Sequence, residues 1–243
     1  MYIKNLRDVS AIVFVLIFVL TFIACDNPLT DDNNSNGQSN DVVADPEQGY
    51  LGNSFTLPSG RINEWGYNFW GPEGGVGYAV PALFNRIGSS DVLQVYEAVY
   101  VLEIGDYEGV LITVPNESNL IKWDEVYPEV ENITSSDSNL EMQILDRLMA
   151  SNTATLSDDI YGKAIRTNSE RTTYISWIYA DRDSIVSGYY YDSDDNMFSL
   201  NLELRQGWNS ILNEWDSSDQ VERLTVGPEP SGMIWLYPMD QFD

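Results

Sequence analysis

Hydrophobic and polar residues alternate most regularly over residues 197–205, near the C-terminal end of the chain. The two sets are Phe198, Leu200, Leu202 and Leu204 on one side, and Ser199, Asn201, Glu203 and Arg205 on the other. A period of two residues predicts a β-strand with one buried face and one face in water. Segments rich in β-branched and aromatic residues predict four more strands, at 172–180, 184–191, 210–215 and 233–237.

Two strands are also predicted in the first half of the chain, at 91–104 and 109–114. The alternation in the first of them changes phase around Ala98 to Leu102, so we expect a bulge there. The residues between the two strands, Gly105 to Gly109, suit a hairpin with a longer loop.

One segment has the periodicity of a helix. Its apolar residues would form a single stripe at helical spacing, and they are Leu140, Ile144, Leu145 and Leu148. Ser138 stands three residues before Glu141, which is the spacing of a capping box. We therefore expect one short α-helix over residues 138–150, which covers a sheet face or a barrel end or, alternatively, binds a partner.

Together these elements predict a mainly β fold, either an antiparallel β-sandwich or a partly open barrel, with that one helix. The folded domain is expected to span residues 50–243, with a subdivision near residues 151–171 as an alternative. The preceding residues, 25–49, are acidic and rich in Asn, Asp, Ser and Gly. Such a composition cannot bury enough apolar surface to fold, and it predicts a flexible tether.

The first residues carry positive charge on Lys4 and Arg7, and residues 11–24 are then uncharged and almost wholly apolar. A membrane-spanning helix needs about 20 apolar residues, so this run is too short to cross a bilayer. A basic start followed by a short apolar run is typical of a secretory signal peptide, here residues 1–24. The alternative is an uncleaved signal anchor.

The apolar run ends in the sequence Phe22-Ile23-Ala24-Cys25. This sequence resembles the lipobox of bacterial lipoproteins, with Phe22 where that family prefers Leu. The resemblance implies cleavage before Cys25, lipidation of its thiol, and a mature protein anchored to a membrane of the bacterial cell envelope. The outer membrane or the cell surface is expected in preference to the inner membrane.

Four segments of the second half resemble another group of proteins: residues 178–181 (IYAD), 187–188 (SG), 200–209 (LNLELRQGWN) and 234–237 (IWLY). They are similar to the C-terminal domains of uncharacterised lipoproteins from spirochaetes and some other anaerobic bacteria. The resemblance implies an exported β-rich domain and brings no activity with it. Within residues 200–209, Gly207 would permit a tight turn, Trp208 would cover the core, and Asn209 would satisfy backbone groups of the turn.

The chain contains no histidine, and its one cysteine is Cys25. Ser-His-Asp catalysis, Cys-His catalysis and histidine metal sites are therefore excluded. The 38 acidic and 12 basic residues give a formal net charge of −26, which would repel nucleic-acid phosphates and anionic lipid headgroups. We expect a protein that binds no nucleic acid and is not an enzyme. A glycoside hydrolase with a carboxylate pair is the less favoured alternative.

A first candidate site is the segment 64–78, in which aromatic residues alternate with glycines. Its three candidate ligand-binding residues are Trp65, Tyr67 and Trp70. Large aromatic side chains commonly fill one end of a core, which is one interpretation of the segment. The other is an exposed platform that stacks on sugars or on another apolar ligand.

A second candidate site is a pair of acidic turns on either side of the strand predicted at 184–191. The turns contain Asp181, Asp183, Asp192 and Asp194. If the turns met at one end of adjacent hairpins, these side chains could bind a structural Ca²⁺ through oxygen ligands. The alternative is that they are ordinary turn residues, which hydrogen-bond the nearby backbone. No other cofactor is expected.

The function expected from the sequence is that of a membrane-anchored exported lipoprotein with a non-catalytic binding or envelope-structural domain. Its partners would be the membrane, through the lipid on Cys25, and a glycan or an envelope protein. The alternative is a carbohydrate-binding module that uses exposed Trp and Tyr rings.

Overall fold

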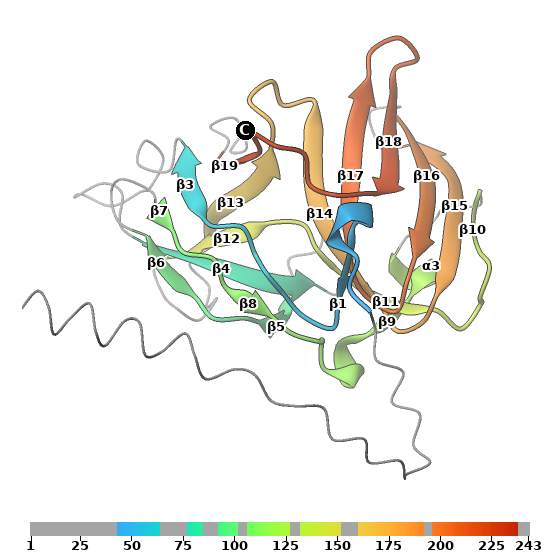
Figure 1. The fold of residues 1–243 in the computed structure, drawn as a ribbon, viewed down its shortest axis with the longest axis horizontal. Helices are drawn as coiled ribbons and strands as arrows, with labels where there is room; N and C mark the ends of the chain where they lie inside the picture. Colours follow the sequence, from blue (N-terminus) through green and yellow to red (C-terminus); the bar gives the residue numbers. More distant parts are fainter. Residues whose placement is uncertain are drawn as a thin grey trace, which may run out of the picture. The chain divides into compact units, whose positions relative to one another are not determined.

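The computed structural model describes residues 43–63, 77–84, 92–101, 106–126, 132–151, 160–191 and 196–237. All of them belong to one compact unit, residues 41–243. Most of the described residues lie in strands: one large sheet contains 17 strands and a small sheet contains two (Figure 1). The predicted mainly β fold is confirmed, and the arrangement is consistent with a β-sandwich. In these ranges no helix is both long enough and apolar enough to span a bilayer.

A long antiparallel ribbon organises the second half of the chain. Its strands are β14 (Thr173–Ala180), β15 (Ser184–Tyr191), β16 (Met197–Leu204) and β17 (Gly207–Asp216). β15 pairs with β16, and β14 pairs with β17. Residues 181–183 and 205–206 join these two pairs, so the ribbon bends at one corner.

β18 (Val221–Val226) lies between the two strand pairs of the ribbon, where it runs antiparallel to β17 and parallel to β16. β1 (Tyr50–Gly52), preceded by the 3₁₀-helix η1 (Pro46–Gln48), pairs with β17 close to the corner. β10 (Ile133–Ser135) pairs with the other edge of β15. Across this part of the sheet the order is therefore β10, β15, β16, β18, β17, β14 (Figure 1).

The remaining strands form the rest of the large sheet and the small sheet. In the large sheet they are β3 (Gly60–Asn63), β4 (Gly77–Phe84), β5 (Val92–Val95), β6 (Val99–Val101), β7 (Asp106–Tyr107), β9 (Ile121–Lys122), β11 (Glu141–Leu145), β12 (Leu148–Ser151), β13 (Ile160–Thr167) and β19 (Ile234–Leu236). β2 (Phe55–Thr56) and β8 (Leu111–Ile112) make the small sheet, and η2 (Glu117–Asn119) and α3 (Trp123–Val126) are single turns. β13 pairs with β12, β14 and β19, so it connects the ribbon with this second part of the sheet.

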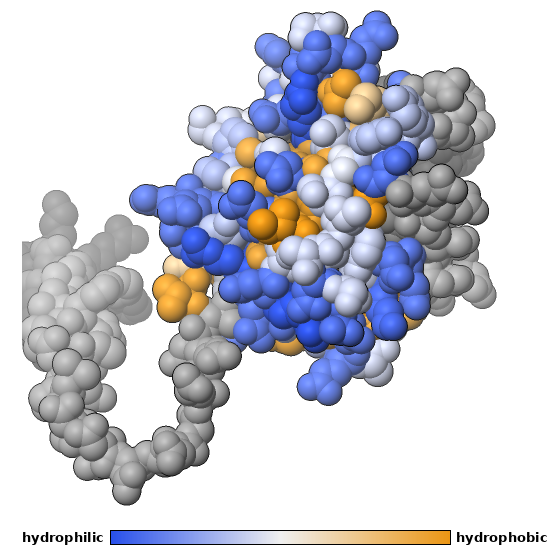
Figure 2. Space-filling view, turned by 90° about the vertical axis from the view of Figure 1, so that its right-hand side faces the viewer, coloured by the Kyte–Doolittle hydropathy of each residue, from blue (hydrophilic) through white to orange (hydrophobic). Residues whose placement is uncertain are grey.

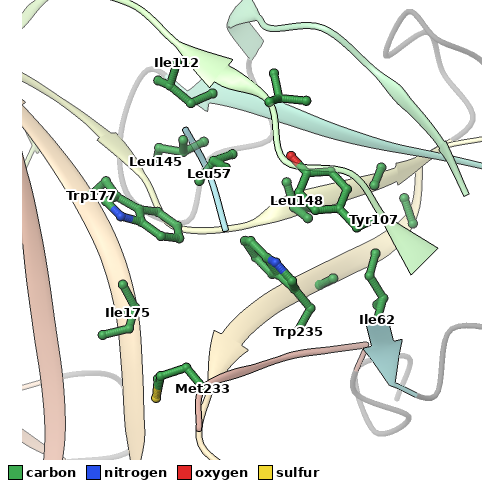
Figure 3. Packing of buried hydrophobic residues seen from close by; sticks show 14 of the residues in the cluster. Leu57, Ile62, Tyr107, Ile112, Leu145, Leu148, Ile175, Trp177, Met233 and Trp235 are labelled. Carbon is green, nitrogen blue, oxygen red and sulfur yellow. The ribbon is translucent and has the colours of Figure 1, made fainter. Parts of the chain in front are cut away.

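The main core lies between the two parts and is built around tryptophan. Trp177, Trp208 and Trp235 are all buried in it. Figure 3 shows Trp177 and Trp235 among aliphatic side chains of this cluster, and their ring centroids are 6.1 Å apart. On the opposite face of the ribbon a second cluster contains Ile178, next to Trp177 in sequence. β14 is thus buried on both faces, which explains its nearly continuous apolar sequence.

The prediction of a helix over residues 138–150 is wrong: this segment forms β11 and β12, which are separated by Asp146 and Arg147. β11 is buried on both faces, because Met142 and Ile144 pack in the second cluster while Leu145 packs in the main core. Gln143 lies on the same face as Leu145 and is also fully buried, with its amide hydrogen-bonded to the Asn119 carbonyl. The apolar residues of the segment also fit a helical spacing, which the local sequence does not distinguish from a strand. Ahead of β11, the carboxylate of Asp137 accepts the Asn139 amide at 2.8 Å, which closes a turn.

The hairpin predicted between 91–104 and 109–114 is also wrong. β5 and β6, with a break at residues 96–98, both pair with β4, and β7 pairs with β3. β8 covers only Leu111–Ile112 and pairs with β2. Gly109 therefore lies between two strands that pair with N-terminal strands, β7 with β3 and β8 with β2, and not in a local hairpin. Which strands pair in this region depends on contacts between residues far apart in the sequence, and the local sequence does not determine them.

The strands predicted at 172–180, 184–191, 197–205, 210–215 and 233–237 are confirmed as β14 to β17 and β19. The predicted turn at 207–209 lies slightly earlier, at residues 205–206. Gly207 starts β17 with φ +101°, a conformation that favours glycine. β18 was missed, because its sequence, VERLTV, alternates weakly and follows a run of acidic and polar residues.

Tyr107 is buried against Trp235, with the two ring centroids 5.7 Å apart. Its hydroxyl has no hydrogen-bond partner among the described residues. Replacing Tyr107 with phenylalanine should raise the free energy of unfolding at pH 7 by about 1 kcal/mol, since an unsatisfied buried polar group is removed. Urea unfolding of residues 41–243 measures this. Tyr50→Phe is the control: it loses the hydrogen bond to the Glu203 carbonyl and should cost about 1 kcal/mol.

The same variant should change the response to alkali. Burial raises the pKa of Tyr107 well above its usual value of 10. The folded state thus favours the neutral hydroxyl over the ionised one. This preference contributes fully to the free energy of unfolding below pH 10, and the contribution is lost as the pH rises above 10. Between pH 7 and 11, Tyr107→Phe should therefore lose less stability than the wild type. A lower stability of Tyr107→Phe at pH 7 would contradict this account.

Candidate functional site

Most of the residues predicted to form sites lie outside the described residues. These are Cys25, Trp65, Tyr67, Trp70, Asp192 and Asp194. Whether the rings of segment 64–78 are buried or exposed therefore stays a prediction, and so does the lipidation of Cys25.

Asp181 and Asp183 lie at the corner of the ribbon, and both are used by the fold. The Asp181 carboxylate accepts the Glu141 amide at 2.9 Å and is paired with Arg182 at 2.7 Å. This hydrogen bonding raises the pKa of the Arg182 guanidinium. Asp183 accepts the Gln206 amide at 2.8 Å and so ties the two connections of the corner together.

These contacts are those of ordinary turn residues. In the described part of the chain no cluster of three or more acidic, His or Cys side chains is arranged to hold a metal ion. The calcium site stays a prediction, without support from Asp181 and Asp183.

The inner side of the corner is held by Asn209, which is fully buried. Its side-chain oxygen accepts the Arg205 amide at 3.0 Å. Its side-chain nitrogen donates to the carbonyls of Arg205, Gly207 and Ile178 at 2.8, 2.9 and 3.3 Å. Asn209 thus satisfies backbone groups of the turn, as predicted, and Trp208 beside it is buried in the main core, also as predicted. Asn209 is a folding element, with no donor left for a ligand.

An open cleft of about 340 Å³ lies beside the same corner. The residues that line it are Tyr50, Ser136, Asp183, Ser184, Ile185, Glu203, Leu204 and Arg205. Its volume falls within the range of small-molecule sites, about 300–1,000 Å³. The cleft combines two carboxylates, a guanidinium, hydroxyl groups and two apolar side chains.

Arg205 is fixed in this cleft by an aromatic ring. Its guanidinium carbon lies 3.7 Å from the centroid of the Tyr50 ring. The Tyr50 hydroxyl in turn donates to the Glu203 carbonyl at 3.2 Å, which holds the ring beside β16. A cation stacked on an aromatic face loses little freedom when it binds a ligand, because its position is already set.

The two serine hydroxyl groups of the cleft are, like that of Tyr50, already engaged with the protein. The Ser184 hydroxyl contacts the hydroxyls of Ser135 and Ser136 at 2.8 and 3.1 Å. The Ser136 hydroxyl also accepts the Ile185 amide at 2.8 Å. These bonds fix the wall of the cleft, so Asp183, Glu203 and Arg205 are the side chains that can serve a ligand. Together they supply both hydrogen-bond acceptors and donors.

From the cleft, a strip of exposed and half-buried side chains runs along the face of β15, β16 and β18. We call it the tyrosine strip, and it consists of Ile185, Ser187, Tyr189 and Tyr191 of β15, Ser199, Asn201 and Glu203 of β16, and Arg223 and Thr225 of β18. Their cross-strand partners place them in register: Ile185 with Glu203, Ser187 with Asn201 and Thr225, and Tyr189 with Ser199 and Arg223. Alternate residues of a strand share a face, so these rows are stacked along one surface.

The strip ends in two exposed tyrosines, which the sequence analysis missed as site residues. Tyr189 and Tyr191 are 40% and 58% exposed, and their rings meet edge to face with centroids 6.1 Å apart. Tyr190 between them points to the other face, where it stacks on Phe198 at 4.7 Å. The alternation within the sequence SGYYYD could have separated the outer rings from the inner one.

Other exposed large hydrophobic residues lie on several elements, among them Leu93 and Val95 of β5, Tyr100 of β6 and Leu111 of β8. Figure 2 shows one side of the molecule, on which most side chains are hydrophilic and the hydrophobic ones form small separate groups. Isolated apolar side chains of this kind are normal on a protein surface and do not by themselves indicate an interface. The cleft and the tyrosine strip are therefore the features of the described surface that best fit a binding site.

Comparison with known proteins gives no match. No protein-family model matches the chain. Neither a curated protein nor a solved structure is significantly similar to it. The site must therefore be interpreted from its own geometry.

Proposed function

We propose that this chain is an exported protein, anchored to a bacterial membrane by a lipid on Cys25, whose β-rich domain binds a ligand or partner at the cell envelope without catalysis. Residues 1–25 support the anchor, because a basic start, a short apolar run and a cysteine after alanine follow one another there. The acidic, polar residues that follow support a tether between the membrane and the domain.

The observation that carries the binding role is the cleft beside the corner of the ribbon. It is open, it has the volume of a ligand site, and its guanidinium is held in place by Tyr50. Its side chains offer charge and hydrogen bonds, which orient a ligand. Asp183 and Glu203 are the carboxylates that a glycoside hydrolase could use there. The structural role of Asp183, which accepts the Gln206 amide, favours binding instead.

The anchor can be tested by replacing Cys25 with serine, which removes the thiol that would receive the lipid. In a bacterial host fed with radiolabelled palmitate, the wild-type chain should be labelled and should remain with the membranes after washing in high salt. Cys25→Ser should carry no label and should leave the membrane fraction on cleavage or accumulate as precursor. Equal labelling of both proteins would contradict the anchor.

A second candidate function is carbohydrate binding, and the tyrosine strip favours it. Exposed aromatic rings next to Ser, Asn, Thr and Arg side chains can contact the apolar face of a sugar while hydrogen-bonding its hydroxyls. This makes Tyr189 and Tyr191 the favoured platform among the described residues. Trp65, Tyr67 and Trp70 remain the alternative platform.

A further inference from the structure

We propose that the cleft and the tyrosine strip together form one extended site for a neutral oligosaccharide. The inference rests on the second candidate function above and assigns to it a location, a ligand class and a direction of binding. The oligosaccharide would lie along β15, with one end in the cleft and the other against Tyr191.

The cleft provides the most specific contacts of this site. Asp183 and Glu203 accept hydrogen bonds from sugar hydroxyls, and Arg205 donates hydrogen bonds to sugar oxygens. Ile185, which is 47% exposed, offers an apolar surface to one side of a sugar ring. A hydroxylated ring carries donors, acceptors and an apolar face close together, and the cleft has a counterpart for each.

The middle of the strip is polar and uncharged. Ser187, Asn201 and Thr225 stand in one row across three strands, on the face that also bears Ile185 and Glu203. Hydroxyl and amide groups can both donate and accept, so they suit a chain of hydroxyl groups in several orientations. This row connects the cleft with the tyrosines without a change of charge.

The far end of the strip offers aromatic surface. Since the Tyr189 and Tyr191 rings are nearly perpendicular, at 83°, they form a step rather than a flat floor. Behind them Arg223 is held by Asp216 and Asp219 at 3.4 and 2.7 Å, which stiffens the β17–β18 turn. From Ile185 to Tyr191 the strand covers about 20 Å, so a ligand that reaches both ends must be an oligosaccharide and not a single sugar.

The composition of the strip argues against a protein partner. Only Ile185, Tyr189 and Tyr191 contribute large exposed hydrophobic side chains to it. A standard protein interface needs about 800 Å² from each partner, with an apolar centre that this strip lacks. The formal net charge of −26, together with Asp183 and Glu203 in the cleft, disfavours an acidic sugar chain. A neutral sugar chain remains the best match.

The test is calorimetric titration of the full chain, solubilised in detergent, with hexasaccharides. The neutral probes are the hexamers of glucose, mannose, xylose and N-acetylglucosamine, and the acidic probe is the hexamer of galacturonic acid. At least one neutral hexamer should bind, and at least tenfold more tightly than the acidic one. Tyr191→Ala and Arg205→Ala should each weaken this binding at least tenfold, and Asn201→Ala at least threefold.

Two controls separate loss of contact from loss of structure. Tyr100→Ala removes a tyrosine of similar exposure, 50%, from β6 and should change affinity less than twofold. Tyr191→Phe keeps the ring and should stay within threefold of the wild type. The far-ultraviolet circular dichroism of every variant should match that of the wild type.

Three results would overturn the inference. In the first, no hexamer binds. In the second, the acidic hexamer binds as tightly as the neutral ones. In the third, a neutral hexamer binds, but Tyr191→Ala and Arg205→Ala leave its affinity unchanged while Trp65→Ala or Trp70→Ala abolishes it; carbohydrate binding would then stand, at another site. None of these results depends on the lipid at Cys25, so failure of the anchor is seen separately.

Discussion

Replacing Trp235 with alanine should lower the free energy of unfolding of residues 41–243 by about 3–5 kcal/mol, a large share of a domain's total of about 5–15 kcal/mol. Trp235 is fully buried and packs against Tyr107 and Trp177. Its ring nitrogen donates to the Pro58 carbonyl at 2.7 Å, and that carbonyl would lose its partner. The cavity left by the ring and the unsatisfied Pro58 carbonyl would therefore both lower the free energy of unfolding.

The position of β19 increases this effect. Trp235 pairs with Arg166 of β13 on one side and with Ile62 of β3 on the other. β19 thus links the N-terminal strands to the ribbon side of the sheet, and the Arg166 guanidinium also lies 5.6 Å from the Trp235 ring. Urea unfolding followed by tryptophan fluorescence and by circular dichroism would measure the loss.

Trp215→Ala is the matched control for Trp235→Ala. Trp215 is in β17, but its side chain is partly exposed and lies outside the three buried clusters. Its replacement should cost less than half as much as that of Trp235. Equal losses for the two variants would show that the main core is not centred on Trp235.

Replacing Asn209 with alanine should cost about 3 kcal/mol, because several buried backbone groups lose their partner at once. The Arg205 amide and the Arg205 and Gly207 carbonyls all bond the Asn209 side chain at 3.0 Å or less. Asn209→Asp should cost more, since it has a similar shape but turns a buried negative charge toward these carbonyls. Thermal unfolding of residues 41–243 gives both values.

Asn213 offers the control for Asn209. It lies four residues further along β17 and donates to the Glu222 carboxylate at 2.9 Å, in a partly exposed setting. Asn213→Ala should cost less than about 1 kcal/mol, as is usual for a partly solvated pair. If Asn213→Ala lowered stability as much as Asn209→Ala, the hydrogen bonds at the corner would not contribute more to stability than those elsewhere in the ribbon.

The sequence predicted the strands of the ribbon well, because each has either a clear period of two or a dense run of β-branched and aromatic residues. It failed at β11 and β12 for a physical reason. Gln143 lies on the same face of β11 as Leu145, yet it is fully buried, with its amide hydrogen-bonded to the Asn119 carbonyl. The apolar residues Leu140, Ile144, Leu145 and Leu148 also fit a helical spacing, and the strand pairings that decide against a helix are long-range.

The candidate site was less predictable than the fold. Tyr50, Ser136, Asp183, Glu203 and Arg205 come from widely separated parts of the chain, and no local motif joins them. Their meeting depends on the bend of the ribbon and on the pairing of β1 with β17. The sequence did indicate the corner itself, through Gly207 and Asn209. The exposed tyrosines required knowledge of which face of β15 is covered.

The most direct test of the central claim, that the chain is anchored to a membrane by a lipid on Cys25, is the mass of the N-terminal peptide of the protein purified from bacterial membranes. The account predicts a peptide that starts at Cys25 and carries a diacylglycerol on its thiol. A peptide that starts at Met1, or one that contains an unmodified Cys25, would contradict it.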